Sequence, residues 1–250
     1  MRTPRAARLW GALVLAALAV APGTGQAAND AYDPFSGYGS HSARVGLTGG
    51  LLTGTLPPAS GGGQYVQQSL GAEFNALLFS EPTVFGTLLG IEFDAVLGGR
   101  VVDRPPGAVD SEGDTEGIKP VFKMDFEFAY DLVRWKLFAL RQRLILNAGG
   151  GFDYNSHPWV LINGESGWRA YPLIGGHLQT SLGDSVLLDV SYRYVPTQSK
   201  EGVGTEHRLQ VGLGIKRVVL GAHLITTRFV GEGSLALDQT QLGAFAAWTL

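Results

Sequence analysis

The sequence contains no cysteine. This absence excludes a disulfide framework and every metal site built from thiolates. Beyond its first twenty residues, the chain also lacks any unbroken apolar run of the about 20 residues that a membrane helix requires. It has no basic surplus either, because Asp and Glu number 22 against 19 for Lys and Arg. Nucleic acid attracts strongly basic surfaces, so we expect no nucleic-acid partner.

The N-terminus has the layout of a secretory signal peptide. A basic start with three arginines precedes an apolar or small stretch at 9–20 and small residues at 25–27, which suit a signal-peptidase site. The apolar stretch is too short for a retained anchor. We expect three segments: a signal peptide at 1–27, a periplasmic N-terminal segment at 28–42 and a single β-domain at 43–250.

Alternation with a period of two dominates the rest of the chain. In the clearest case Phe122, Phe126 and Phe128 alternate with Lys123, Asp125 and Glu127. A strand separates such sets onto two faces, whereas a helix scatters them. Similar segments recur near 43–54, 64–79, 85–97, 122–132, 143–154, 168–182, 186–194, 208–216, 218–229 and 238–250.

Segments of this length suit the tilted strands of a membrane barrel. Because only helices and closed barrels satisfy the backbone in lipid, the pattern predicts an all-β fold. We expect a transmembrane antiparallel up-and-down β-barrel of about ten strands, with eight as the alternative.

The predicted connections alternate between long and short. Long polar connections fall at 55–63, 101–118, 155–167, 196–205 and 230–237, and short ones at 80–83, 183–184 and around 216–217. Short periplasmic turns and longer external loops are typical of outer-membrane barrels. The stretch 132–143 fits neither class, so either its strands run long or a helical turn intervenes.

A soluble barrel also alternates, with its apolar face turned inward around a ligand, so a soluble periplasmic ligand-binding barrel stays open as an alternative. Two features favour the membrane: a polar face rich in Gly and Ser with few lysines, and aromatic residues near the strand ends, where interfacial girdles lie. The expected lipid-facing or girdle residues are Phe122, Phe126, Tyr130, Trp168, Tyr192, Tyr194 and Trp248.

Two segments carry a family resemblance. Residues 189–194 (DVSYRY) resemble the strand before an external loop in the OmpA-like outer-membrane β-barrel superfamily. The closing segment at 242–250 resembles the C-terminal signal read by the barrel-assembly machinery, although it ends in Leu250 where that signal has Phe or Trp, and Gly243 is off its spacing. The resemblance implies residence in the cell outer membrane of a Gram-negative bacterium. The implied partners are the barrel-assembly machinery, outer-membrane lipid and lipopolysaccharide.

If the apolar faces meet lipid, the polar faces line the interior. The charged residues expected there are Glu73, Glu92, Asp94, Lys123, Asp125, Glu127, Asp153, Arg169, His177, Asp189, Arg193, Arg208 and Lys216. Isolated charges in a narrow barrel are costly, so they are expected to pair or to be hydrated. They form either a salt-bridged plug or the walls of a narrow water path. Because about eight strands are just filled by side chains, ten strands favour a closed or very narrow interior.

Catalytic motifs are not recognisable. Glu92 and Asp94 form an acidic pair of the kind that omptin-like proteases use, but no Asp-x-His follows. Glu206 and His207 are sequence neighbours and therefore point to opposite faces of a strand. The acidic loop at 110–116 lacks the spacing of an EF-hand and is interpreted as solvated. We expect no catalytic residue, cofactor or metal.

The leading functional hypothesis is a non-enzymatic outer-membrane barrel with a structural or surface-interaction role, or a narrow pore. The competing hypothesis is an outer-membrane hydrolase, a protease or lipid-modifying enzyme, with its site at the barrel mouth.

Overall fold

The computed structural model describes residues 41–55, 63–79, 88–103, 119–154, 168–182, 186–199, 202–231 and 236–249. The expected signal peptide, most of the expected N-terminal segment and the acidic loop at 110–116 lie outside these ranges. Within them, no helix is long and apolar enough to cross a membrane.

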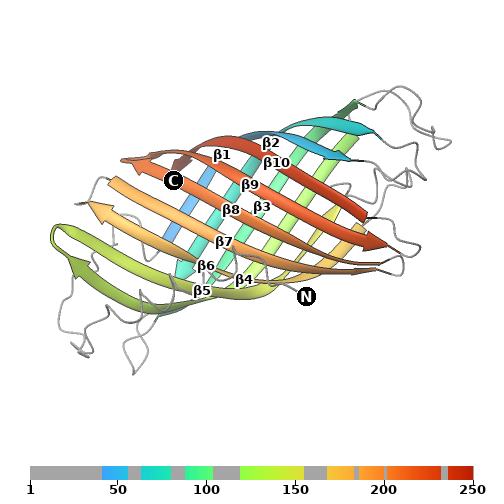
Figure 1. The fold of residues 1–250 in the computed structure, drawn as a ribbon. Helices are drawn as coiled ribbons and strands as arrows, with labels where there is room; N and C mark the ends of the chain where they lie inside the picture. Colours follow the sequence, from blue (N-terminus) through green and yellow to red (C-terminus); the bar gives the residue numbers. More distant parts are fainter. Residues whose placement is uncertain are drawn as a thin grey trace. The chain divides into compact units, whose positions relative to one another are not determined.

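The described residues form ten antiparallel strands. They are β1 (His41–Thr55), β2 (Gln64–Phe79), β3 (Leu88–Asp103), β4 (Lys119–Leu137), β5 (Leu140–Tyr154), β6 (Trp168–Leu182), β7 (Val186–Ser199), β8 (Gly202–Ile215), β9 (Val218–Gly231) and β10 (Ala236–Thr249). Each strand pairs with its neighbours in sequence, and β1 pairs with β10 to close the barrel (Figure 1). The prediction of a ten-stranded up-and-down barrel is confirmed, and the eight-stranded alternative is wrong.

The structure decides between the alternatives for one connection and corrects the expectation for another. Between β4 and β5 only Phe138 and Ala139 intervene, so the strands run long there and no helical turn is present. A β-bulge between Asp131 and Val133 shifts the register, which explains why the alternation weakens at that point. The long loop expected at 196–205 is wrong, because the β7–β8 ladder continues through Pro196↔Thr205 and on to the ends of both strands.

The two ends of the barrel differ in their connections. The two-residue β4–β5 and β8–β9 turns lie at the end that also holds Thr249 of β10. We call this end the turn side, and the opposite end, where β1 finishes at Thr55 and β5 at Tyr154, the loop side. In the β8–β9 turn, Lys216 has a positive φ of 57°.

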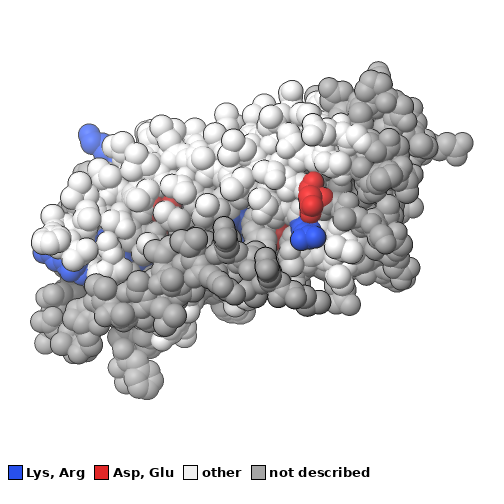
Figure 2. Space-filling model, in the orientation of Figure 1, with Lys and Arg blue, Asp and Glu red and all other residues white. Residues whose placement is uncertain are grey.

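The distribution of apolar and polar side chains in the barrel is the reverse of that in a soluble protein. Every strand places large apolar side chains on the outer wall, among them Leu47, Leu70 and Leu220, which are 64%, 69% and 57% exposed. The outer face in Figure 2 is accordingly almost free of charge. Buried residues include many charged and amide side chains, such as Glu92 and Arg193. The alternation therefore sorts apolar residues outward and polar residues inward.

The aromatic residues expected on the outer face occupy outward positions. Phe126, Trp168 and Trp248 are exposed. Phe122, Tyr130, Tyr192 and Tyr194 are half-buried, and the three tyrosines alternate with buried residues along their strands. On the loop side the Trp168 ring packs 5.1 to 5.9 Å from the rings of Phe122, Phe152 and Tyr154. These rings form an aromatic cluster at one rim of the apolar wall.

Candidate functional site

The centre of the interior is organised around Arg193 on β7. Its guanidinium lies 2.7 Å from Glu92 Oε1, 2.7 Å from Asp94 Oδ2 and 2.6 Å from Glu127 Oε1. These carboxylates belong to β3 and β4, which are not neighbours of β7 in the barrel. The ion pairs therefore cross the interior. They compensate the charges of Glu92, Glu127 and Arg193, which are almost fully removed from solvent.

Glu92 extends this cluster toward the turn side. His177 Nε2 lies 2.8 Å from Glu92 Oε2, and its Nδ1 lies 3.0 Å from Asp189 Oδ1. The amides of Asn75 and Asn147 also donate to Glu92. Both imidazole nitrogens of His177 are thus held by carboxylates. We call Glu92, Asp94, Glu127, His177 and Arg193 the central cluster.

A second group of contacts surrounds Tyr171 on β6. Its hydroxyl donates to Asp125 Oδ1 at 2.6 Å, and Asp125 Oδ2 lies 2.8 Å from Arg208 and 3.1 Å from Lys123. The guanidiniums of Arg169 and Arg208 lie 4.6 and 5.0 Å from the centre of the Tyr171 ring. The ring therefore lies close to two cations, which its π-face attracts.

Further ion pairs fill the rest of this side of the barrel. Arg169 pairs with Asp153, and Arg208 pairs with Glu206. At the turn side Asp131 Oδ2 lies 2.9 Å from the Arg143 guanidinium, which stacks 4.2 Å from the centre of the Phe79 ring. Charge pairing thus continues along most of the interior.

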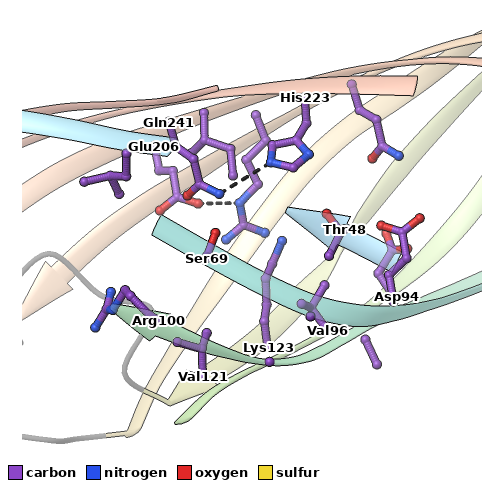
Figure 3. Close-up of a pocket in the computed structure, with 18 of the residues that line it drawn as sticks. Thr48, Ser69, Asp94, Val96, Arg100, Val121, Lys123, Glu206, His223 and Gln241 are labelled. Atoms are coloured by element: carbon purple, nitrogen blue, oxygen red, sulfur yellow. Dashed lines mark hydrogen bonds and ion pairs between the residues drawn. The ribbon is translucent and has the colours of Figure 1, made fainter. Parts of the chain in front are cut away.

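Two cavities lie on either side of the central cluster. The larger one, of about 190 Å³, extends toward the loop side past Thr48 and Gln67 (Figure 3). The smaller one, of about 40 Å³, extends toward the turn side past Gly214. Arg44 and Asn75 line both cavities, so the central cluster and these two residues separate them.

The structure places the expected interior charges as follows. Glu73, Asp94, Lys123, Arg193 and Arg208 line the larger cavity; His177, Glu92 and Asp189 line the smaller one; Asp125, Glu127, Asp153 and Arg169 lie in the ion pairs. Lys216 is a correction, because it is exposed in the β8–β9 turn and does not reach the interior. Strand β8 ends at Ile215, so the alternation cannot be extended to the next residue.

Several interior residues were missed from the sequence. Tyr171, Arg143 and Glu206 were not assigned to the interior, nor were the amides of Asn75 and Asn147. Alternation was the available signal: Tyr171 lies two residues after Arg169 and Glu206 two residues before Arg208. Arg143 follows the bulged β4, where the register could not be read.

Hydrolytic chemistry has little support in this geometry. Ser191 pairs in register with His177, but each nitrogen of that imidazole already contacts a carboxylate. A histidine held in this way has no free nitrogen to accept a proton from a hydroxyl. In the ranges that the structure describes, no three His, Asp or Glu side chains are grouped to hold a metal ion.

Comparisons with known proteins return outer-membrane barrels. No protein-family model and no curated protein matches the sequence. Among solved structures, the outer-membrane protease OmpT from Escherichia coli aligns with a TM-score of 0.42 at 8% identity, over 84% of this chain and 96% of OmpT.

Two further alignments are weaker in TM-score. Outer-membrane phospholipase A from Escherichia coli aligns with a TM-score of 0.34 at 11% identity, over 82% and 89% of the two chains. Ail, the attachment invasion locus protein of Yersinia pestis, gives 0.28 at 11% identity, over 82% and 99%. Proteins of different activities appear among these matches, so they assign no activity to this chain.

Proposed function

We propose that this chain is an integral protein of the Gram-negative outer membrane, non-enzymatic, whose barrel is closed by its own charges. Its role is structural or lies in interactions at the cell surface. The observation that carries the proposal is the position of Arg193, which reaches across the barrel to three carboxylates between the two cavities.

The outer wall supports the membrane location. Soluble monomers rarely expose a contiguous apolar patch of more than a few hundred Å². Here all ten strands carry exposed Leu, Val, Ile, Phe or Trp side chains. A lipid environment satisfies such a wall, and the closed ladder leaves no strand edge unpaired in it.

The central cluster supports a closed interior. An ion path along the axis would have to pass the contacts of Arg193 with Glu92 and Glu127, both of which are almost fully buried. Removing one partner from a buried ion pair costs about 3–5 kcal/mol. Opening by thermal fluctuation is therefore rare.

A narrow pore is the second candidate. Arg44 and Asn75 line both cavities, so only these two residues and the central cluster separate the two spaces. A rearrangement of Arg193 together with Arg44 and Asn75 would join the two spaces. This candidate predicts flux of small solutes, which the closed barrel does not permit.

Fractionation and flux measurements test the proposal. The full chain produced in a Gram-negative host is expected in the outer-membrane fraction and to resist alkaline extraction, whereas recovery in the periplasm would contradict the membrane location. Liposomes that contain the purified protein are expected not to swell in an iso-osmotic solution of a small sugar. Swelling would favour the narrow pore.

A further inference from the structure

The larger cavity has a built polar wall that the closed-barrel proposal does not use. On one side the cavity is bounded by β10, β1 and β2, where Gly50 of β1 lies opposite Gly243 of β10; strands β3, β4, β7, β8 and β9 line the rest. Neither residue has a side chain, and the ends of Gln241 and His223 occupy the space beside them. The flanking inward residues are Gln241 on β10 and Ser69 on β2, both of which line the cavity (Figure 3).

Gln67 is the strongest sign that the cavity takes a ligand. Its side chain lines the cavity and is 1% exposed, and neither its amide oxygen nor its amide nitrogen has a hydrogen-bond partner in the structure. Buried amides are normally hydrogen-bonded, because leaving one unsatisfied is costly. Gln67 offers one acceptor and two donors to whatever occupies the space.

The register brings the polar side chains together. Leu52 of β1 pairs with Gln67 on one side and with Gln241 on the other, so the two amides flank it. Ser69 follows Gln67 on the same face of β2, and its hydroxyl donates to the Gly50 carbonyl at 3.3 Å. Gln241 Nε2 lies 3.4 Å from His223 Nε2. Two amides, a hydroxyl and an imidazole thus face one space.

Charged side chains around the cavity are engaged with other residues. Arg100, which lines the cavity and lies opposite Ser69 in the ladder, also has interactions of its own. Asp94 pairs with Arg193, Lys123 with Asp125 and Glu206 with Arg208. Glu73 also lines the cavity, but it lies six residues along β2 from Gln67, roughly 20 Å at ~3.3 Å per residue. A charged solute beside Gln67 would compete with existing ion pairs, whereas an uncharged one would not.

The volume limits the occupant to a single small molecule. A cavity of about 190 Å³ corresponds to about six water molecules at ~30 Å³ each. Its lining includes no Phe, Tyr or Trp ring on which a nucleobase could stack. Aliphatic side chains, among them Leu52, Val96 and Ile225, line it together with amides, so an acyl chain there would leave the amides unpaired. The chemistry that remains is a compact solute with several hydroxyl groups.

We propose that this cavity binds one uncharged polyhydroxylated solute of monosaccharide size, through Gln67, Ser69 and Gln241. Amides suit vicinal hydroxyls because each amide donates and accepts at the same time. The site lies on the loop side of the central cluster, so it does not require the barrel to conduct. Solute binding at this site is therefore independent of whether the barrel is closed to ions.

Titration calorimetry on the purified full chain in detergent tests the proposal. The probes are D-glucose, D-galactose and N-acetyl-D-glucosamine, with inorganic phosphate and glycine as charged and zwitterionic comparisons. We expect at least one sugar to bind with one-to-one stoichiometry, and phosphate and glycine not to bind.

Variants locate the site. Gln67→Leu removes no internal hydrogen bond and is expected to weaken sugar binding about three- to tenfold, the effect of one or two lost hydrogen bonds. Ser69→Phe fills the cavity and is expected to abolish binding. Gln68→Leu is the matched control, because Gln68 is the next residue and is exposed on the outer wall; it is expected to bind as the unmodified protein does.

Three outcomes would overturn the proposal. If none of the three sugars binds, the cavity holds water only. If a sugar binds equally to Gln67→Leu and Ser69→Phe, its site lies elsewhere. A preference for phosphate or glycine would show that the ligand is charged. Heat-dependent electrophoretic mobility confirms in each case that the barrel is folded, and closure is measured separately, by conductance.

Discussion

The two sides of the barrel interior are built from the same alternating strands and yet differ in content. On β3 to β8 the inward positions carry long charged side chains and Tyr171, and these fill the space with ion pairs. On β9, β10, β1 and β2 most inward positions beside the larger cavity carry amides, hydroxyls or aliphatic side chains. The cavity lies between these residues and charged residues of β3, β4, β7 and β8. Period-two patterning thus decides which residues face inward, and side-chain size decides whether the interior is closed or hollow.

Glycines illustrate the difference. A Cβ at Gly151 on β5 would collide with the Asp125 carboxylate and lie 2.6 Å from the Tyr171 ring, so long side chains already occupy that space. A Cβ at Gly50 on β1 would meet first the flexible end of Gln241, at 3.0 Å. Glycine makes room on both sides, for a carboxylate and an aromatic ring at Gly151 and for a movable amide at Gly50.

The largest expected effect is the loss of Arg193. Arg193→Ala leaves Glu92, Asp94 and Glu127 without their common cation and is expected to lower the free energy of unfolding by about 3–5 kcal/mol. Arg44→Ala, on the hollow side, removes a cation 5.5 Å from the centre of the Phe245 ring and is expected to cost about 0.5–1 kcal/mol. Urea titration in lipid vesicles measures both. Equal losses would contradict the assigned difference between the two sides.

The next-largest expected effect compares an arginine on the outer wall with an arginine in the interior. Leu213 is 44% exposed on the outer face of β8, and an arginine there is expected to cost about 2–4 kcal/mol if the face meets lipid. Gln210 on the same strand lines the larger cavity, so Gln210→Arg is expected to be tolerated. Folding yield into vesicles distinguishes the two variants. The reverse ranking would mean that the apolar wall does not face lipid.

A smaller effect tests the glycines. Gly151→Ala overpacks the contact between Asp125 and Tyr171 and is expected to destabilise the barrel by about 1–3 kcal/mol. Gly50→Ala is expected to change stability much less, because the Gln241 side chain can move aside. The same urea titration measures both variants, and a larger loss for Gly50→Ala would indicate that the hollow side is packed.

The smallest expected effect is a gain in stability rather than a loss. Gln67→Leu replaces a buried amide that has no partner and is expected to raise the free energy of unfolding by about 1 kcal/mol in the absence of solute. A decrease would show that the amide makes an internal hydrogen bond.

Much of the fold could be predicted from the sequence, because alternation is a local signal. The bounds expected for β2 and β6 coincide with those observed, and the ten strands are correct in number. The sequence-based predictions are wrong where the alternation is interrupted or runs past the end of a strand. The bulge after Asp131 interrupts the period, and the turn at Lys216 ends a strand although the alternation in the sequence continues to that residue.

The candidate site was less predictable than the fold. Alternation indicated that Glu92, Glu127 and Arg193 face inward, but not that they meet, because their pairing depends on how strands β3, β4 and β7 lie across the closed barrel. The unpartnered state of Gln67 depends on the side chains of other strands in the same way. Contacts across a barrel are long-range and leave no short motif.

The most direct test of the closed interior is single-channel conductance of the purified full chain in a planar lipid bilayer. We predict a protein that inserts fully and stays silent, and discrete current steps only after Arg193→Ala removes the cation that holds the central cluster together. Regular steps from the unmodified protein would contradict the account and establish a pore.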